Sequence, residues 1–439
     1  MSVIGNLRLD PGTKVPMSVG EAVEVLVGPQ EQVRVEAYDG SVHGPVDAPM
    51  VLKLRTPRAV AYLAGAPSSL GFARAYVAGD LEVEGCHPGD PYPLLRAAET
   101  LLEPHRPSPS QAVRALRSFG RLALSLPELP PQEVPGNLRR VVNGLRHSRH
   151  RDAEAIHHHY DVSNRFYEMV LGPSMAYTCA CYPDDGASLE QAQEHKFDLV
   201  ARKLGLRPGM RLLDVGCGWG GMVRHAVRES GVTALGVTLS HDQATWAQAA
   251  IERDGLAGRA EVRHLDYREV PEVGFDAVSS IGLTEHVGVG NYPSYFGFLL
   301  SRLRPGGRLL NHSITRPDNK HPGIKRRGFI DRYVFPDGEL TGSGAIIAAM
   351  QDAGFEVQHE ENLRRHYART LAAWCQNLVE NWDECVAEVG VGTAKVWGLY
   401  MAGSRLGFER RQIELHQVLA TRTDEGGDPH FPMRPDFGV

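Results

Sequence analysis

Cysteine is scarce in this 439-residue sequence, and the six that occur are scattered without the CxxC spacing of a metal or redox pair. The pattern excludes a disulfide framework and a zinc ribbon, and it favours a reducing compartment. The N-terminus lacks a basic stretch followed by an apolar one, and no run reaches the roughly 18 apolar residues of a spanning helix. We expect a cytoplasmic protein without a visible export signal or membrane anchor.

An excess of charge of one sign is missing as well. The chain has 47 lysines and arginines against 53 aspartates and glutamates, a formal net charge of -6. No general basic field is available, so we expect no nucleic-acid partner, and an anionic partner requires a local patch. With 42% hydrophobic and 23% charged residues the composition is that of a globular protein. At roughly 150 residues per domain, the length predicts two or three domains.

Residues 1–105 have the pattern of a small α+β domain. Short apolar runs at 23–27, 33–38 and 50–55 favour strands, and the stretch 57–64 favours a helix. Residues 71–85 have the sequence GFARAYVAGDLEVEG. We therefore predict a smaller N-terminal domain that is distinct from the rest of the chain.

Residues 106–155 differ from their surroundings because arginine, proline and serine dominate them. We interpret this segment as a linker that contains a basic helix, in which Arg114, Arg117 and Arg121 share one face. Two interpretations stay open. The face is either solvated while the helix packs on a neighbouring domain, or it docks peripherally on anionic lipid headgroups.

Residues 156–439 alternate apolar strand patterns with helical ones. The segments that favour strands are RLLDV, TALGVTLS, AEVRHLDY, FDAVSSIGL and GGRLLNHSIT. Strands that alternate with helices predict a doubly wound, mostly parallel sheet, so the fold class is α/β and Rossmann-like.

A glycine loop follows the first of these strands. Gly216, Gly218 and Gly221 satisfy G-x-G-x-x-G, which dinucleotide enzymes share with methyltransferases. Gly220 lies within the same loop, and Asp214 precedes it in the form typical of S-adenosylmethionine (SAM) sites. A carboxylate there suits a cationic sulfonium and an amino-acid group. We predict that this loop binds SAM.

The ends of the next two strands separate the cofactor alternatives. An NAD enzyme needs an acidic residue near the end of the second strand, where this chain has Thr238 and Ser240. Asp242 lies slightly beyond and leaves NAD as an alternative. Asp266 and Tyr267 close the third strand and suit adenine, although Asp266 alone is equally typical of a helix cap.

Several segments resemble one family in their sequence and in their order along the chain. They are HHYDVSNRFYEMVLGPSMAYTCACY at 158–182, LLDVGCGWGG at 212–221, GVTLSHDQ at 236–243, LDYRE at 265–269, EHVG at 285–288, NYPSYF at 291–296, RYVFPDGEL at 332–340 and HYARTLAAW at 366–374. Together they resemble the cyclopropane-fatty-acyl-phospholipid synthase family, which includes mycolic acid cyclopropane synthases and fatty-acyl methyltransferases. GFARAYVAGDLEVEG resembles the lipid-handling N-terminal domain of the phospholipid-acting members.

The resemblance implies a SAM-dependent C-methyltransferase. The methyl carbon passes to the cis double bond of an unsaturated acyl chain in a membrane phospholipid, and bound bicarbonate then deprotonates the carbocation. The product is a cyclopropane or a 10-methylene chain, the precursor of a 10-methyl branch. The methylene product implies a flavin-dependent reductase as a partner. We also expect peripheral contact with the inner face of the membrane through the Arg-rich segment, and homo-oligomerisation stays open. The alternatives are a SAM methyltransferase for a soluble small molecule and a noncatalytic lipid carrier.

The same resemblance assigns site residues. The bicarbonate pocket and catalytic residues are Cys179, Glu285, His312, Ile314 and Tyr367. The cofactor residues are Tyr177, Thr178, Asp214, Gly216, Gly218, Gly220, Thr238, Ser240, Gln243, Asp266, Tyr267 and Ile281. Glu285 is expected to orient His312 or to accept the acid proton. Ser404 replaces a cysteine that many family members carry, so a thiol there is not required. The adjacent histidines 157–159 cannot all face one ion, and no metal is expected.

Overall fold

The computed structural model describes residues 17–28, 31–66, 69–101, 108–120, 127–133, 162–320, 328–335 and 338–438. Arg121 and the three histidines at 157–159 lie outside these ranges. Contacts divide the chain into two compact units, Met1–Cys86 with Arg96–Leu129, and His87–Leu95 with Pro130–Val439. The predicted three-part division, with a lipid-handling first part, stays a prediction.

Four described strands of the first unit form one sheet in the order β2-β1-β3-β4. β1 (Val33–Ala37) runs parallel to β3 (Met50–Leu54), and β2 (Val42–His43) and β4 (Leu81–Glu84) add antiparallel edges. The helices of this region are α1 (Val19–Val27), α2 (Pro57–Gly65), α3 (Ser69–Val77) and α5 (Pro109–Ser118), and α4 (Tyr92–Leu101) spans the division between the units.

The strand predicted at 23–27 is wrong, because these residues belong to α1. Ser18 caps the helix: its side chain accepts from the Glu21 backbone N–H, while the Glu21 carboxylate accepts from the Ser18 N–H. Val19 and Ala22, three residues apart, are buried. This capping box and the helical spacing of the buried residues outweigh the preference of the valines for strands.

Seven described strands of the second unit form the main sheet, in the order β10-β11-β9-β8-β5-β6-β7. They are β5 (Arg211–Val215), β6 (Thr233–Thr238), β7 (Ala260–His264), β8 (Phe275–Ile281), β9 (Leu303–Thr315), β10 (Glu356–Asn362) and β11 (Glu414–Thr421). β11 is antiparallel to both neighbours, and the other pairs are parallel. The predicted α/β, mostly parallel sheet is confirmed.

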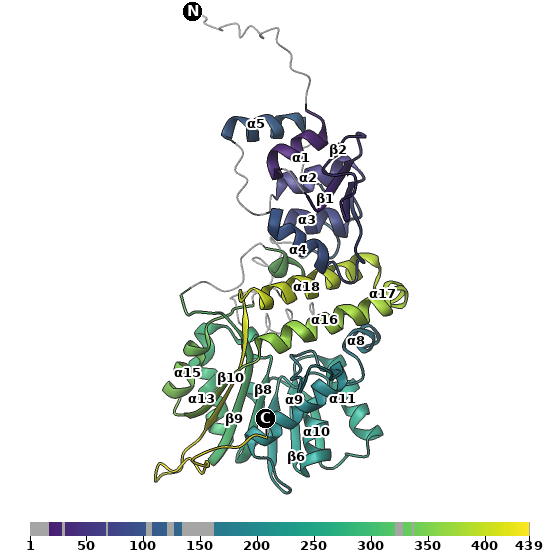
Figure 1. The fold of residues 1–439 in the computed structure, drawn as a ribbon. Coiled ribbons are helices and arrows are strands. Elements are labelled where there is room, and N and C mark those ends of the chain that lie inside the picture. The colour runs from purple at the N-terminus through teal and green to yellow at the C-terminus, as the bar shows by residue number, and fades with distance from the viewer. Residues whose placement is uncertain are drawn as a thin grey trace, which may run out of the picture. The chain divides into compact units, whose positions relative to one another are not determined.

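The helices of the second unit lie against the faces of this sheet or across one end of its strands (Figure 1). They are α8 (Asn164–Leu171), α9 (Leu189–Leu204), α10 (Gly221–Ser230), α11 (His241–Arg253), α12 (Thr284–Val287), α13 (Tyr292–Arg302), α14 (Phe329–Tyr333), α15 (Ser343–Asp352), α16 (Arg364–Glu380), α17 (Trp382–Val389) and α18 (Val391–Glu409), with single 3-10 turns at Tyr267–Glu269 and Val289–Asn291. α9 packs on β8 and β9, whereas α13 packs on β9 and α15 on β10 and β11. α16 and α18 lie side by side, and α16 also contacts β11.

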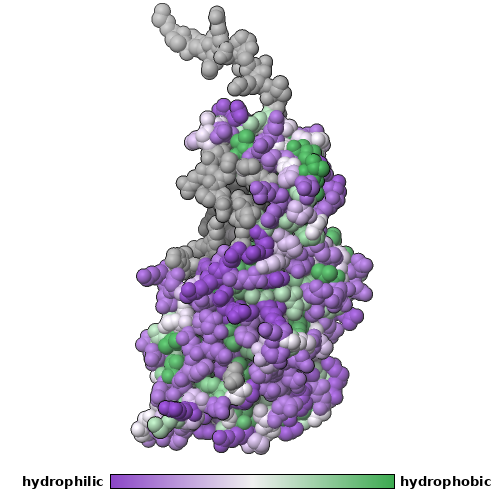
Figure 2. All heavy atoms as spheres, viewed as in Figure 1, coloured by the Kyte–Doolittle hydropathy of each residue, from purple (hydrophilic) through white to green (hydrophobic). Residues whose placement is uncertain are grey.

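The main core lies between the sheet and the helices α13 and α15. Leu213, Val278 and Leu309 from the sheet meet Phe296 and Met350, and all five are fully buried. Alternate residues of the same strands point to the other face, toward α9. Within the described ranges every helix is too short or too polar to span a bilayer. On the face seen in Figure 2 hydrophilic residues dominate and apolar ones form only scattered patches.

Candidate active site

The glycine loop after β5 has the backbone that glycine permits. Gly216 and Gly218 have φ of 71° and 54°, and a Cβ at Gly216 would lie 3.1 Å from the Leu283 Cβ. Two cavities of about 550 and 940 Å³ adjoin this loop. Both are lined by Gly216, Gly218, Gln243 and Gly282, so they form one continuous region at the carboxyl ends of the strands.

Most predicted cofactor residues line these two cavities. They are Tyr177, Thr178, Asp214, Gly216, Gly218, Thr238, Gln243, Tyr267 and Ile281. The Thr238 hydroxyl donates to Gln243 Oε1 at 2.7 Å, which joins the end of β6 to α11. The site therefore collects residues from four strand ends and from the segment before α9, as a nucleotide-like ligand requires.

Three predicted cofactor residues do not line either cavity, and each has a contact within the protein. Ser240 caps α11 by accepting from the Gln243 backbone N–H. Gly220 begins α10 with a φ of 73°, and a Cβ there would approach Ala247. Both carboxylate oxygens of Asp266 accept from the Arg268 guanidinium, and the contact of Asp266 with adenine stays a prediction.

Lys196 is a cavity residue that the sequence reasoning missed. It lies on α9, is 1% exposed and donates to Thr178 Oγ1 at 3.0 Å. Burial lowers its pKa to about 8, and burial raises the pKa of Asp214, across the same cavity, to about 7. A buried ammonium and a buried carboxyl group at one cavity suit the two charged ends of an amino acid. The sequence signal that could have identified Lys196 is a lysine on the apolar face of a predicted helix, because lysine is rarely buried without a partner.

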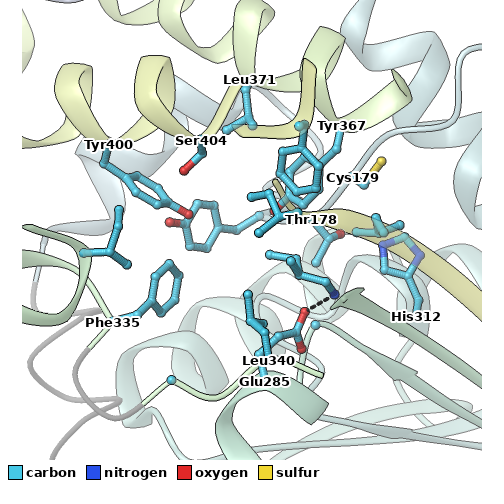
Figure 3. Close-up of a pocket in the computed structure, with 18 of the residues that line it drawn as sticks. Thr178, Cys179, Glu285, His312, Phe335, Leu340, Tyr367, Leu371, Tyr400 and Ser404 are labelled. Carbon is cyan, nitrogen blue, oxygen red and sulfur yellow. Dashed lines mark hydrogen bonds between the residues drawn. The ribbon is translucent and has the colours of Figure 1, made fainter. Parts of the chain in front are cut away.

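A third cavity, of about 950 Å³, brings together all five predicted catalytic residues (Figure 3). Cys179 comes from the segment before α9, Glu285 from α12, His312 and Ile314 from β9, and Tyr367 from α16. The rest of the lining is mostly apolar or aromatic and includes Ile330, Phe335, Leu340, Leu371, Tyr400, Phe408, Ile413 and Leu415. Ser404 lines this cavity as well.

Glu285 presents one free carboxylate oxygen to this cavity. Its Oε1 accepts from the Ile314 backbone N–H at 2.7 Å, the bond drawn in Figure 3. Its Oε2 is buried and has no hydrogen-bond partner among the described residues. Burial raises the pKa of Glu285 to about 7. The side chain is thus poised to gain or lose a proton near neutral pH.

His312 presents a ring nitrogen to the same cavity. Its Nδ1 lies 3.2 Å from Gln417 Nε2, while its Nε2 is buried and has no partner among the described residues. Burial, and then the charges of Lys196 and Lys203, hold the pKa of His312 well below its usual value. The ring is therefore neutral. The residue that orients it is Gln417 and not Glu285.

Cys179 is unsuited to nucleophilic chemistry. Its side chain is completely buried, and this burial raises the pKa of the thiol well above its usual value. The sulfur lies 3.1 Å from the Ala180 carbonyl oxygen. The group is therefore a thiol rather than a thiolate, and Cys179 belongs to the lining of the pocket.

Comparison with known proteins decides the family. The family model for mycolic acid cyclopropane synthetase matches residues 147–418. The chain belongs to this family. A probable fatty acid methyltransferase of Mycobacterium tuberculosis is 59% identical over 420 residues, which cover 95% of this chain and 98% of the relative. The cyclopropane-fatty-acyl-phospholipid synthase of Escherichia coli K12 is 35% identical over 269 residues, 61% of this chain and 68% of that one.

A solved structure agrees with the sequence match. A mycolic acid cyclopropane synthase in complex with SAH and CTAB is 31% identical, with a TM-score of 0.58, and the match covers 61% of this chain and 97% of that one. The family member described here is thus a SAM-dependent methyltransferase with the fold of the cyclopropane synthases. This confirms the predicted family, the enzyme class and SAM as the methyl donor, whereas the predicted bicarbonate stays a prediction.

Proposed function

We propose that this family member transfers the methyl carbon of SAM to the cis double bond of an unsaturated acyl chain in a membrane phospholipid. A bicarbonate ion in the third cavity serves as the base, and the product is a cyclopropane or a 10-methylene chain. The names of the relatives support fatty-acyl chemistry, and the phospholipid-acting relative of Escherichia coli supports the substrate class.

The observation that carries this proposal is a pair of buried polar atoms that have no hydrogen-bond partner in the described part of the chain. Glu285 Oε2 and His312 Nε2 belong to different elements and line one mostly apolar cavity. Each unsatisfied buried group costs about 1–3 kcal/mol, so native proteins keep such groups for a ligand or a reaction. Bicarbonate fits both atoms, because one oxygen accepts from an imidazole N–H while its O–H donates to a carboxylate. Tyr367 lines the same cavity and adds a hydroxyl.

The remaining walls suit a reaction that water would quench. Leu340, Leu371 and Phe408 give the cavity that Glu285 lines an apolar surface, and apolar walls disfavour the water that would hydrate a carbocation. The rings of Phe335 and Tyr400 face the cavity in Figure 3 and offer aromatic faces to positive charge.

The first two cavities fit the cofactor. SAM, when bound, supplies an electrophilic methyl carbon. Gly216 and Gly218 leave room for close approach of the ligand, and Lys196 and Asp214 are placed to hold its carboxylate and ammonium. Thr178 lines both this cavity and the third cavity, which we call the acyl cavity after its proposed substrate, so the two sites meet at this residue.

The partners belong to the proposal too. We propose that the first unit handles lipid and that the Arg-rich segment contacts the inner face of the membrane. In support, Arg114 and Arg117 are exposed on α5. A 10-methylene product would require a flavin-dependent reductase to saturate it. A homo-oligomer remains part of this proposal.

The test is a product analysis. The purified protein is incubated with SAM and oleoyl phospholipid liposomes, and the released fatty acid methyl esters are analysed by gas chromatography with mass spectrometry. We expect a gain of one CH2 unit. Derivatisation of double bonds then separates a ring, which has no alkene, from a methylene branch, which has one. No gain under conditions where SAM binds would reject the acyl substrate and favour a soluble acceptor.

A further inference from the structure

Behind the acyl cavity lies a buried ammonium group that the proposed chemistry does not use. Lys203, at the end of α9, has a side chain that is 0% exposed. Burying a charge is costly, and an apolar side chain of similar size is often at least as stable in such a position. Stability alone therefore does not account for a lysine here.

The contacts of Lys203 connect it to the cavity. Its Nζ forms an ion pair with Glu361 on β10 and donates to Gln417 Oε1 on β11 at 2.6 Å. Gln417 is fully buried and stands opposite His312 in the register of β11 and β9. The other end of its amide, Nε2, lies 3.2 Å from His312 Nδ1. A continuous chain of polar contacts thus runs from Glu361 to His312.

The chemistry of the groups determines which atom donates and which accepts at each of these contacts. An ammonium can only donate, so the atom of Gln417 that faces it must be the oxygen. The NH2 group of the same amide must then face His312, and Nδ1 must accept from it. In a neutral imidazole the single hydrogen consequently lies on Nε2, the nitrogen for which the described ranges contain no hydrogen-bond partner.

We propose that Lys203 and Gln417 are positioning residues that hold His312 as a neutral ring with its hydrogen on Nε2, so that this N–H donates to an oxygen of the anion in the cavity. This inference rests on the proposed function for the presence of that anion. The charged groups around the ring act in the same direction. Lys196 and Lys203 both disfavour a positive charge on His312, whereas no described carboxylate forms a hydrogen bond with it.

The tautomer can be observed directly. Nitrogen-15 NMR of protein labelled at histidine distinguishes protonated from unprotonated ring nitrogens, and the His312→Gln variant identifies the signals of His312. We expect an unprotonated Nδ1 and a protonated Nε2. The opposite tautomer or a doubly protonated ring in the wild-type protein would overturn the proposal.

Two variants test whether the chain of contacts causes this state. Lys203→Met removes the ammonium, which frees the amide to turn, and we expect hydrogen on Nδ1 in part of the population. Gln417→Glu presents only acceptors, so we expect Nδ1 to carry hydrogen. The control is Gln358→Glu on the neighbouring strand β10, whose amide donates to Thr421 Oγ1 and does not reach His312. An unchanged tautomer in both variants would overturn the assignment.

Activity gives a second readout. Loss of a hydrogen bond to a charged group is expected to lower kcat in Lys203→Met by roughly 10- to 100-fold, while the affinity for SAM stays within about 2-fold. Unchanged kcat together with a changed tautomer would show that Nε2–H has no role in turnover. Because the NMR experiment needs no substrate, a wild-type protein with the expected tautomer and no alkylated lipid would reject the proposed function alone.

Discussion

Replacing Glu285 with glutamine separates the chemistry from cofactor binding. The glutamine oxygen can still accept from the Ile314 N–H, so the local backbone should keep its position. The group that replaces Oε2 is an NH2, which donates where the reaction needs an acceptor. Loss of one charge-assisted hydrogen bond costs about 1.5–3 kcal/mol, and loss of a proton acceptor typically costs a factor of about 10² or more. We expect kcat to fall by at least about 100-fold.

The affinity for SAM should change by less than about 2-fold in this variant, because Glu285 does not line either cofactor cavity. Turnover is measured from the released S-adenosylhomocysteine, and SAM affinity by calorimetry. The matched control is Glu252→Gln, which makes the same change at an exposed position of α11. An equal loss of SAM affinity and turnover in Glu285→Gln would refute the assignment of Glu285 to the acyl cavity.

The same variant has a pH-dependent effect on stability. The folded-state pKa of Glu285 is about 7 and its ordinary value is 4.5, so the folded protein holds this proton more tightly than the unfolded chain. Protonation of Glu285 therefore contributes fully to the free energy of unfolding below about pH 4.5, and this contribution is lost as pH rises through about 7. The total change in the free energy of unfolding is up to about 3 kcal/mol. The free energy of unfolding, measured with denaturant at pH 5 and at pH 8, should therefore decrease less between these pH values in Glu285→Gln than in the wild type. An equal loss in both would contradict the buried carboxyl group.

Three further predictions concern the cofactor cavities. Gly218→Val should abolish SAM binding measured by calorimetry, because its φ of 54° is strained for a β-branched residue and the side chain enters the ligand space; normal affinity would mean that this loop does not bind SAM. Lys196→Met should weaken SAM binding by roughly 10- to 100-fold, with the exposed Lys320→Met as control, and unchanged affinity would remove Lys196 from the site. Asp214, with a pKa of about 7, ionises between about pH 6 and 8, so the affinity of the wild type for SAM should rise over that range. The affinity of Asp214→Asn for SAM should not change with pH over the same range. An equal pH dependence of the affinity in both proteins would contradict the role of this carboxyl group.

Much of the fold could be predicted because its signals are local. The apolar strands that alternate with helices, and the glycine loop between the first strand and α10, appear in the structure as β5 to β9 with their helices. The error at 23–27 has a local cause as well. The capping box of Ser18 and Glu21 is visible in the sequence, and in the structure it outweighs the strand preference of the valines.

Asp266 shows where a position in a motif is insufficient. Its place at the end of the third strand agreed equally with a cofactor contact and with a helix cap. Only the side-chain geometry reveals that Arg268, two residues away, takes both carboxylate oxygens. The carboxylate consequently caps the turn at Tyr267–Glu269 and is engaged within the protein.

The sequence alone determined the class of this protein, because strand periodicity, a glycine loop and ordered motifs are properties of short segments. It also named the five residues of the acyl cavity through the family resemblance. Only the tertiary structure decided how His312 is held. Lys203 and Gln417 are 214 positions apart, and Gln417 and His312 are 105 apart. The register of β11 against β9 and the packing of α9 on the sheet bring them into contact, and no local pattern encodes such a pairing.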